Sequence, residues 1–320
     1  MQIRNWLFDI GLIKIHTYNI PIISVGNITA GGTGKTPFII YLANFFKQKK
    51  MHIAVISRGY GRKTKGYQLV SDGQRFKGET EKHGDEPVLI ARSLANVLVA
   101  VSEKRYVAID DILKKYSIDL ILLDDGFQHR YIARKVDLLL IRNTGLLKNK
   151  FVLPAGQLRE FKFNKKRAQI IIDTSRERSR TSNDIFNCNF QPMQFIDINF
   201  KTFGKMSALQ NKRCLAFAGI ANPDSFKNSL KEQNIDIAEF ISFRDHYAYN
   251  YSDLEVLINK CLIEKINYLI CTEKDLVKIC EIDHVEELLK NYDIKLIALR
   301  IGAILNNENA FFRKLNSLLD

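Results

Sequence analysis

The sequence predicts an α/β protein: a P-loop NTPase parallel sheet with helices on both faces, plus a second, smaller α/β domain. Three observations lead to this prediction. Short runs rich in leucine, isoleucine and valine alternate with longer helical patterns along most of the 320 residues. Many of these runs are continuously apolar, which is typical of parallel strands covered on both faces. A glycine-rich loop lies between the first apolar run and the first long helical pattern, which is the position of a P-loop.

The apolar runs and helical patterns give the expected order of elements. Strands are expected at 20–25, 52–57, 96–101, 120–124, 136–141 and 169–174, and later at 213–218, 268–272 and 295–300. Helices are expected between them at 36–48, 85–93 and 107–116. The succession of strand, helix and parallel strand implies right-handed crossovers.

A polar and less regular stretch, 176–210, divides this pattern into two parts. We interpret it as a linker with two short alternating pieces, near 186–190 and 193–203, after which Arg213 begins a second α/β unit. We therefore expect a P-loop domain with an N-terminal amphipathic helix over residues 1–190. A second α/β domain is expected over 191–320, and its C-terminal segment can pack back on the first domain.

The charge of the chain favours a polyanionic partner. Lys and Arg number 48 against 35 Asp and Glu, a formal net charge of +13, which suits nucleic acid, an anionic membrane or a phosphorylated substrate. The basic stretches 162–167 and 176–180 fit either a solvated surface or contact with lipid or phosphate. The five cysteines have no CxxC or zinc spacing, as expected of buried, reduced thiols. No apolar run is long enough to span a bilayer, and we expect no signal peptide.

The first residues of the chain form a helical apolar pattern. Ile3, Trp6, Leu7 and Ile10 fall at helical spacing, with polar residues between them. Such an amphipathic helix can lie on a membrane or bind acyl chains. It can equally pack on its own domain, and the residues alone leave both interpretations open.

Residues 21–36, PIISVGNITAGGTGKT, predict a nucleotide site. The glycines let the backbone approach phosphate oxygens, and the loop amides and the start of the following helix hold the anion. Lys35 is expected to contact the β- and γ-phosphates, and the Thr36 hydroxyl to bind Mg²⁺. The generic P-loop pattern has glycine where this chain has Thr29. The predicted nucleotide-binding residues are Thr29, Ala30, Gly31, Gly32, Thr33, Gly34, Lys35 and Thr36.

A second motif, LILLDD at 120–125, supports the nucleotide site. Asp124 and Asp125 end an apolar strand, which is where a P-loop enzyme keeps its metal-side acid. Side chains alternate along a strand, so the two carboxylates cannot both face the same way. We expect one to address the metal and the other a loop or the substrate, and which is which stays open.

Seven segments, in order, resemble the tetraacyldisaccharide 4′-kinase family, the lipid A kinases of Gram-negative bacteria. They are VGNITAGGTGKTP at 25–37, SRGYGR at 57–62, GDEP at 84–87, DDGFQH at 124–129, LPAGQLRE at 153–160, FRDHYAY at 243–249 and TEKD at 272–275. The resemblance covers residues 1–275. It also accounts for Thr29, because the family's loop carries Thr or Ser at that position.

The resemblance implies an ATP-dependent kinase of lipopolysaccharide biosynthesis. Such an enzyme transfers the γ-phosphate to the 4′-hydroxyl of tetraacyldisaccharide 1-phosphate, with ATP and Mg²⁺ as cofactors. The family acts as a peripheral protein on the cytoplasmic face of the bacterial inner membrane, and its N-terminal helix is associated with acyl chains and membrane. The resemblance therefore implies an anionic lipid surface as a partner, and no nucleic acid.

The resemblance also implies the catalytic residues. The Asp that matches Asp85 resembles a catalytic base, supported by the His that matches His246, and Lys35 completes the set. A carboxylate can take the proton of the attacking hydroxyl while an imidazole orients it or passes the proton on. If His246 reaches Asp85, the active site is an interdomain cleft.

Four residues are candidates for the metal: Thr36, Asp124, Asp125 and Glu160. Three arginines suit phosphate recognition, because guanidinium groups match phosphate oxygens. They are Arg58, Arg62 and Arg159.

Two other classes of protein share some of these features. A P-loop GTPase or metal-insertion chaperone hydrolyses nucleotide to act on a protein partner, but it would carry a Cys/His metal motif, which the sequence lacks. A nucleic-acid-binding ATPase would suit the charge, but it would need aromatic stacking platforms and a basic stripe.

Overall fold

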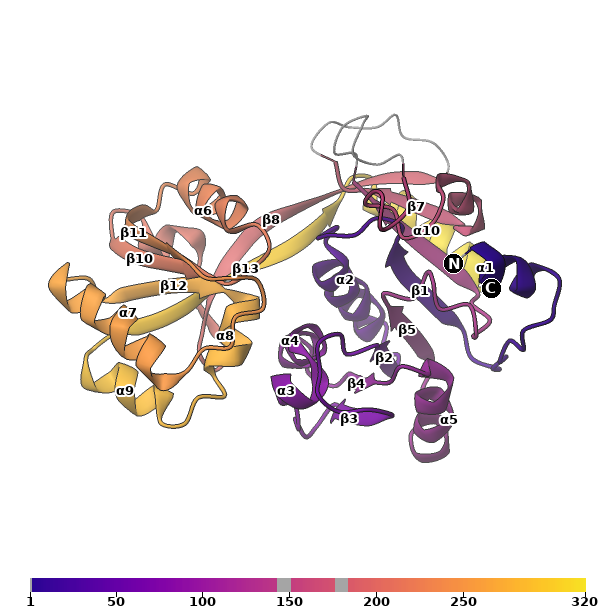
Figure 1. Cartoon of the computed structure of the whole chain (residues 1–320), viewed down its shortest axis with the longest axis horizontal. Helices are drawn as coiled ribbons and strands as arrows, with labels where there is room; N and C mark the ends of the chain where they lie inside the picture. Colours follow the sequence, from indigo (N-terminus) through magenta and orange to yellow (C-terminus); the bar gives the residue numbers. More distant parts are fainter. Residues whose placement is uncertain (1, 143–150, 176–183) are drawn as a thin grey trace. The chain divides into compact units, whose positions relative to one another are not determined.

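The computed structural model describes residues 2–142, 151–175 and 184–320 (Figure 1). The predicted α/β fold class is confirmed. The chain divides into two compact units, Met1–Phe190 with Ala303–Asp320, and Gln191–Gly302. Two long strands, β8 (Ile185–Asp197) and β13 (Lys295–Leu305), pass from one unit into the other.

The remaining elements fall within one unit each. The first unit contains α1 (Gln2–Asp9), β1 (Ile22–Asn27), α2 (Lys35–Gln48), β2 (Ile53–Ser57), β3 (Gln68–Ser71), α3 (Thr80–His83), α4 (Asp85–Ser93), β4 (Leu98–Val101), α5 (Arg105–Lys115), β5 (Leu120–Asp124), β6 (Val136–Ile141), the 3₁₀-helix η1 (Lys162–Arg167), β7 (Ile170–Asp173) and α10 (Glu308–Leu319). The second contains β9 (Thr202–Gly204), η2 (Met206–Leu209), β10 (Arg213–Ala218), α6 (Pro223–Glu232), β11 (Asp236–Ser242), α7 (Tyr251–Ile263), β12 (Tyr268–Thr272), α8 (Glu273–Ile279) and α9 (Val285–Asn291).

The sheet of the first unit is parallel apart from one edge strand. Its order is β8-β7-β6-β1-β5-β2-β4-β3, in which the first residues of β8 pair with β7 and β3 runs antiparallel to β4. Val25 near the end of β1 lies opposite Asp124 at the end of β5. The loop after β1 and the acidic end of β5 are therefore neighbours at the carboxyl edge of the sheet, where α/β proteins bind ligands.

Helices cover both faces of this sheet, as the continuous apolar runs predict. Ile109 and Ile112 of α5 share a core cluster with Ile121 and Leu123 of β5. Because side chains alternate along a strand, Asp124 continues the other face of β5. The helix α2, which packs over β1, β2 and β5, begins directly after the glycine-rich loop.

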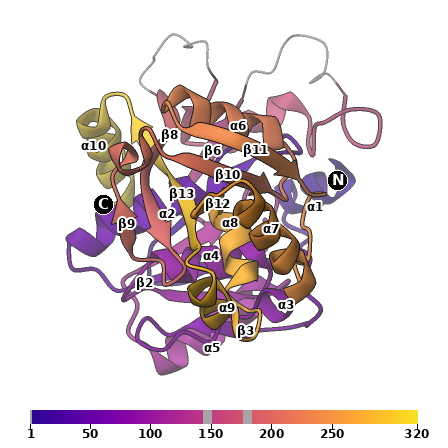
Figure 2. The ribbon, with the colours of Figure 1, turned by 90° about the vertical axis from the view of Figure 1, so that its left-hand side faces the viewer.

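The second unit is also a sheet between two layers of helices (Figure 1; Figure 2). Its parallel strands follow the order β11-β10-β12-β13. Phe226 and Leu230 of α6 pack with one set of strand residues, and α7, α8 and α9 pack with the alternate set. The start of α7 is fixed by a capping box between Asn250 and Asp253, which satisfies amide groups that a helix end leaves free.

The predicted linker at 176–210 is wrong for its central part, which forms a continuous strand. In β8 the residues at both ends are buried, whereas those from 189 to 194 are exposed or half-buried. Phe186 is buried in the first unit and Phe195 in the second. The middle of the strand therefore carries little apolar signal. The basic stretch 176–180 lies outside the described residues.

Within the described residues, no helix has both the length and the apolar character needed to cross a bilayer.

The C-terminal helix α10 packs on the first unit through Phe311. The Phe311 ring is fully buried and contacts Phe38 of α2 and Phe186 of β8, with ring centroids 6.2 and 5.5 Å apart. This contact joins the last residues of the chain to the helix that follows the glycine-rich loop.

We expect Phe311→Ala to lower the free energy of unfolding of the first unit by about 3–5 kcal/mol, because it leaves a cavity between α10, α2 and β8. Urea denaturation followed by tryptophan fluorescence would measure the change, since Trp6 is the single tryptophan and lies in this unit. Leu262→Ala is the matched control, because Leu262 is exposed on α7. Equal effects of the two substitutions would contradict the role given to Phe311.

Candidate functional site

The glycine-rich loop runs from the end of β1 to the start of α2. Gly34 has a φ of 82° and precedes Lys35, the first residue of α2, and no side chain caps this helix. A Cβ on Gly34 would also overlap the ring of Phe190. The position therefore requires glycine both for its backbone conformation and for the close approach. The uncapped amides at the start of α2 are available to an anion.

A second segment, 157–160, holds the first half of the loop in place. The Ala30 amide donates to the Gln157 carbonyl at 2.7 Å, and the Arg159 amide donates to the Ile28 carbonyl at 2.7 Å. Thr29 pairs with Leu158 as an isolated antiparallel bridge. The residue that departs from the generic P-loop pattern is thus part of a short ladder that fixes the loop.

The second half of the loop is held by its own side chains. Asn27 at the end of β1 donates from Nδ2 to the hydroxyl of the buried Thr33 at 2.9 Å. Gly31 and Gly32, between the two fixed halves, are exposed. The exposed backbone between these two restrained segments can therefore offer its amide groups to a phosphate.

Lys35 and Arg159 meet at the carboxylate of Asp125. The Lys35 Nζ lies 3.4 Å from Asp125 Oδ1, and Arg159 Nη1 donates to both carboxylate oxygens at 2.9 and 2.7 Å. Burial opposes ionisation of Asp125, but these two cations outweigh it and lower the pKa of its carboxyl. Asp125 is thus ionised and fixes both cations beside the loop.

Asp124 lies in a different environment although it is the adjacent residue. Its Oδ2 accepts a hydrogen bond from the Ser57 hydroxyl at 2.9 Å, and its buried Oδ1 has no hydrogen-bond partner among the described residues. Burial, together with the charges of Glu86 and Asp125, raises the pKa of Asp124 to about 6. A carboxylate with a free oxygen beside other carboxylates suits a cation.

The two aspartates differ because the strand ends between them. β5 ends at Asp124, and Asp125 adopts a left-handed conformation with a φ of 48°. Arg105 holds this turn, since its guanidinium donates to the backbone carbonyls of both aspartates at 3.2 Å. Burial lowers the pKa of Arg105 to about 10, so it stays protonated at neutral pH.

The residues present fit a magnesium ion that is shared with a nucleotide. No group of three or more His, Cys, Asp or Glu side chains is arranged as a metal site in the described part of the chain. Mg²⁺ however keeps several waters and takes few protein ligands when it binds phosphates. The unpartnered Asp124 Oδ1 and the hydroxyl of Thr36, which follows Lys35 at the start of α2, supply donors of the required kind.

Glu160, a predicted metal ligand, instead forms contacts with other side chains of the protein. Its fully buried carboxylate forms an ion pair with Arg167 at 2.9 Å. It also accepts hydrogen bonds from Asn5 of α1 at 2.7 Å and from Asn164 of η1 at 2.9 Å. These contacts make Glu160 a structural junction between α1 and η1, and we leave it out of the metal site.

Asp85 and His246 belong to different units. Asp85 is the first residue of α4 and is half-buried, and the neighbouring Glu86 is close enough to Asp124 to raise its pKa. The start of α4 therefore lies near the acidic end of β5. His246 is exposed in the second unit, between β11 and α7, with a φ of 55°.

The loop that carries His246 is fixed by aromatic side chains of the second unit. The rings of Phe243, Tyr247 and Tyr249 pack against one another, with centroids 4.8 to 5.1 Å apart. The Tyr249 hydroxyl donates to Asp275 at 3.0 Å. The flanking residues are thus held in place while His246 faces solvent.

The contacts of Asp275 show the structural role of the TEKD segment. This fully buried carboxylate accepts hydrogen bonds from the Thr272 hydroxyl at 2.6 Å and from the Gly219 amide at 3.2 Å. Gly219, Tyr249 and Thr272 lie at or after the carboxyl ends of β10, β11 and β12. The segment joins the ends of three parallel strands.

Two of the predicted phosphate-binding arginines also have defined environments. Arg62 is buried and ion-paired with Glu103 at 2.6 Å. Arg58 is exposed at the end of β2 and close enough to Arg105 and His129 to lower their pKa values. Arg58 is thus placed at the carboxyl edge of the sheet, whereas Arg62 supports a loop.

Sequence reasoning missed three residues of this site. Ser57 and Arg105 contact the aspartates, and Glu86 acts on Asp124 through its charge. Ser57 lies in the SRGYGR motif and Glu86 in the GDEP motif, so the family motifs could have pointed to both residues. No local pattern pointed to Arg105.

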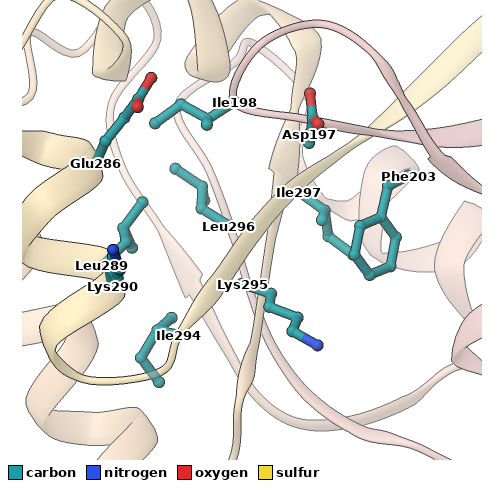
Figure 3. Close-up of a pocket in the computed structure, with 10 residues that line it drawn as sticks. All are labelled: Asp197, Ile198, Phe203, Glu286, Leu289, Lys290, Ile294, Lys295, Leu296 and Ile297. Carbon is teal, nitrogen blue, oxygen red and sulfur yellow. The ribbon is translucent and has the colours of Figure 1, made fainter.

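The second unit contains a cavity of about 340 Å³ at a different place (Figure 3). Apolar side chains such as Ile198, Leu289 and Leu296 line it, and Lys290 and Glu286 lie at its border. It lies at the start of β13, whereas Thr272 and Asp275 lie at the opposite, carboxyl ends of the parallel strands. This cavity is therefore separate from the segments that carry the motifs.

The glycine loop, Lys35 and the acidic end of β5 define a P-loop nucleotide-binding protein of the α/β class. Comparison with known proteins specifies the family. The family model for tetraacyldisaccharide-1-P 4′-kinase matches residues 1–320. The chain therefore belongs to the tetraacyldisaccharide 4′-kinase family, and the alternative of a GTPase or metal-insertion chaperone is not supported.

Individual relatives agree with the family model. Tetraacyldisaccharide 4′-kinase of Desulfotalea psychrophila is 37% identical over 293 residues, which cover 87% of this chain and 84% of the relative. That of Aquifex aeolicus is 36% identical over 311 residues, covering 92% and 90%. A crystal structure of LpxK from Aquifex aeolicus in complex with ATP is similar with a TM-score of 0.85 and 32% identity, covering 100% of this chain and 95% of that one.

We expect Asp124→Asn to stabilise the metal-free protein at pH 8. The folded-state pKa of Asp124, about 6, exceeds the ordinary value of 3.8. At a pH between these two values, Asp124 is mostly protonated in the folded protein and mostly ionised in the unfolded chain. The stability of the wild type therefore falls as pH rises from about 4 to above 6. The two pKa values correspond to at most about 3 kcal/mol.

Urea denaturation in EDTA at pH 4 and pH 8 would measure this difference. Ser57→Ala is the control, because it removes the hydrogen bond to Asp124 without removing the carboxyl. A stability gain for Asp124→Asn that is the same at both pH values would contradict the raised pKa.

Proposed function

We propose that this chain transfers the γ-phosphate of ATP to the 4′-hydroxyl of a tetraacyldisaccharide 1-phosphate. The observation that carries the proposal is the pair of carboxylates at the end of β5, of which Asp125 fixes Lys35 and Asp124 keeps one oxygen free. The family name and the ATP-bound relative support the choice of donor and acceptor.

The phosphate groups of ATP are bound by the loop and its cations. Residues 29–36 surround the phosphates with backbone amides, and Lys35 neutralises charge on the β- and γ-phosphates. Arg159 is ion-paired with the same Asp125 carboxylate and adds a second positive group at the transferred phosphate. Positioning and charge neutralisation supply most of the catalysis in phosphoryl transfer.

Thr36 and Asp124 are the residues that would hold Mg²⁺. The bound ion would neutralise charge on the phosphate oxygens. Asp125 is engaged by Lys35 and Arg159, so we assign it to orienting these cations rather than to direct metal contact. Glu86 adds a negative charge near Asp124 that favours a cation there.

Asp85 would accept the proton of the attacking 4′-hydroxyl, and His246 would support it. A carboxylate at the start of α4 lies on a rigid element near the acidic end of β5. His246 is exposed on a loop that aromatic contacts hold in place. The two residues lie in different units, and the supporting role of His246 is part of this proposal.

The N-terminal helix would bring the enzyme to the cytoplasmic face of the bacterial inner membrane. In α1, Phe8 and Asn5 are buried against the first unit, whereas Ile3 and Trp6 are 76% and 56% exposed. Arg130 fixes the helix through the Asn5 carbonyl at 2.8 Å and Asp9 at 2.7 Å. The helix thus packs on its domain and leaves apolar side chains exposed, which supports the proposal that it contacts a lipid surface.

We expect Asp85→Asn and His246→Ala each to lower the rate of phosphate transfer by about 10²–10⁴-fold, because positioned acid–base groups contribute this much. Lys35→Ala should abolish measurable transfer. The assay follows labelled phosphate from ATP to purified tetraacyldisaccharide 1-phosphate in detergent. Lys47→Ala, on the same helix as Lys35, is the control. Transfer by Lys35→Ala or Asp85→Asn near the wild-type rate would overturn the mechanism.

We expect the double substitution Ile3→Ser/Trp6→Ser to weaken binding to phospholipid vesicles by about tenfold or more, since it removes two apolar side chains from the lipid-facing side of α1. Vesicle sedimentation would measure the partition coefficient. Tyr292→Ser is the control, because this exposed ring lies on the second unit. The membrane role of α1 fails if both proteins sediment alike.

A further inference from the structure

The 3₁₀-helix η1 exposes a pair of aromatic rings next to α1. Phe161 and Phe163 are 46% and 54% exposed, and their rings stack with centroids 5.7 Å apart and planes within 10°. The 3₁₀-helix begins between them, and Asn164 is its buried residue. Two large apolar side chains therefore project together from a short, well-defined element, and such exposed apolar groups mark interaction surfaces.

The same element carries an excess of positive charge. Lys162, Lys165 and Lys166 form no ion pair with a carboxylate at salt-bridge distance in the described part of the chain. Lys165 is half-buried, and this burial, with a smaller effect of the neighbouring Lys162, lowers its pKa although Asp173 acts in the opposite direction. The one remaining cation of η1, Arg167, is ion-paired with Glu160. Lys162 and Lys166, which are both exposed, are thus available to an anionic partner.

Glu160 fixes η1 against α1. One carboxylate oxygen accepts from Asn5 of α1 and from Asn164 of η1, at 2.7 and 2.9 Å. Because both asparagines are buried, the two elements touch at their buried sides. Their exposed apolar residues, Ile3 and Trp6 on α1 and the two phenylalanines on η1, therefore belong to adjoining surfaces.

We propose that η1 is a second membrane-contact element, in which Phe161 and Phe163 enter the interface of an anionic bilayer while Lys162 and Lys166 contact lipid headgroups. The proposal rests on the proposed function, because it extends the membrane surface assigned to α1. Aromatic rings beside lysines suit the bilayer interface, where the ring enters the acyl boundary and the ammonium group stays at the headgroups. Lysine clusters of this kind bind anionic lipids.

The experiment compares vesicle binding by the full chain and its variants. Vesicles contain phosphatidylcholine alone or with phosphatidylglycerol, and sedimentation gives the partition coefficient. Phe161→Ser/Phe163→Ser should lower it about tenfold on both kinds of vesicle, because apolar contact does not depend on lipid charge. Lys162→Gln/Lys166→Gln should lower it about tenfold or more on the anionic vesicles and leave the neutral ones unchanged.

Matched controls separate this surface from a general loss of charge or apolar area. They are Tyr292→Ser for the rings and Lys231→Gln/Lys290→Gln for the lysines, all exposed on the second unit. Controls that bind as the wild type does support the assignment to η1. Wild-type partition of the η1 variants, or equal losses in the controls, would overturn it. Binding of a single-stranded oligonucleotide through the same lysines and rings, without vesicle binding, would also overturn it.

A parallel assay keeps this proposal distinct from the proposed function. In detergent, with the acceptor dissolved, the η1 variants should transfer phosphate at the wild-type rate, since none of these residues lies in the proposed catalytic set. Absence of transfer by the wild type would refute the kinase proposal, whereas the vesicle measurement would still decide whether η1 binds membranes.

Discussion

The ion pairs of Asp125 with Lys35 and Arg159 join three segments of the first unit beside the glycine-rich loop. The three residues come from the end of β5, the start of α2 and the segment after Leu158. The half-buried Asp125 carboxylate stays ionised because both cations are close. Removal of Lys35 or Arg159 would leave it with one cation instead of two. Asp125 lies directly after the end of β5 and has a left-handed backbone conformation.

The segment 157–160 extends this arrangement from the nucleotide loop to the outer surface. Gln157 and Arg159 bond to the backbone on either side of Thr29. The next residue, Glu160, holds α1 and η1 together. Four consecutive residues therefore join the phosphate loop to the elements with exposed apolar side chains. The buried Glu160 therefore has a structural role beside the site, through its contacts with Asn5, Asn164 and Arg167.

The fold could be predicted where a strand lies in one core along its whole length. β5, β6, β10 and β12 have the bounds that their apolar runs predict, because each is buried over most of its length and is followed directly by a charged residue or a glycine. β8 could not be read in this way, since its two ends are buried in different units and its middle is open to solvent. The edge strand β11 is half-buried between two exposed ends, and it likewise lacks a continuous apolar run.

The candidate site could be predicted where chemistry follows from local order, and not where it depends on contacts across the fold. Strand, glycines and lysine in succession indicate the phosphate loop, because the geometry is built from adjacent residues. The different roles of Asp124 and Asp125 depend instead on contacts across the fold. Alternation along a strand excludes that both face one way, but only the contacts with Ser57 and Arg159 show which carboxylate keeps a free oxygen. The same limit applies to Glu160, whose sequence neighbours suggest a metal-side acid. Its partners Asn5 and Arg167 satisfy its charge instead, and a carboxylate already neutralised by a guanidinium has less to offer a cation.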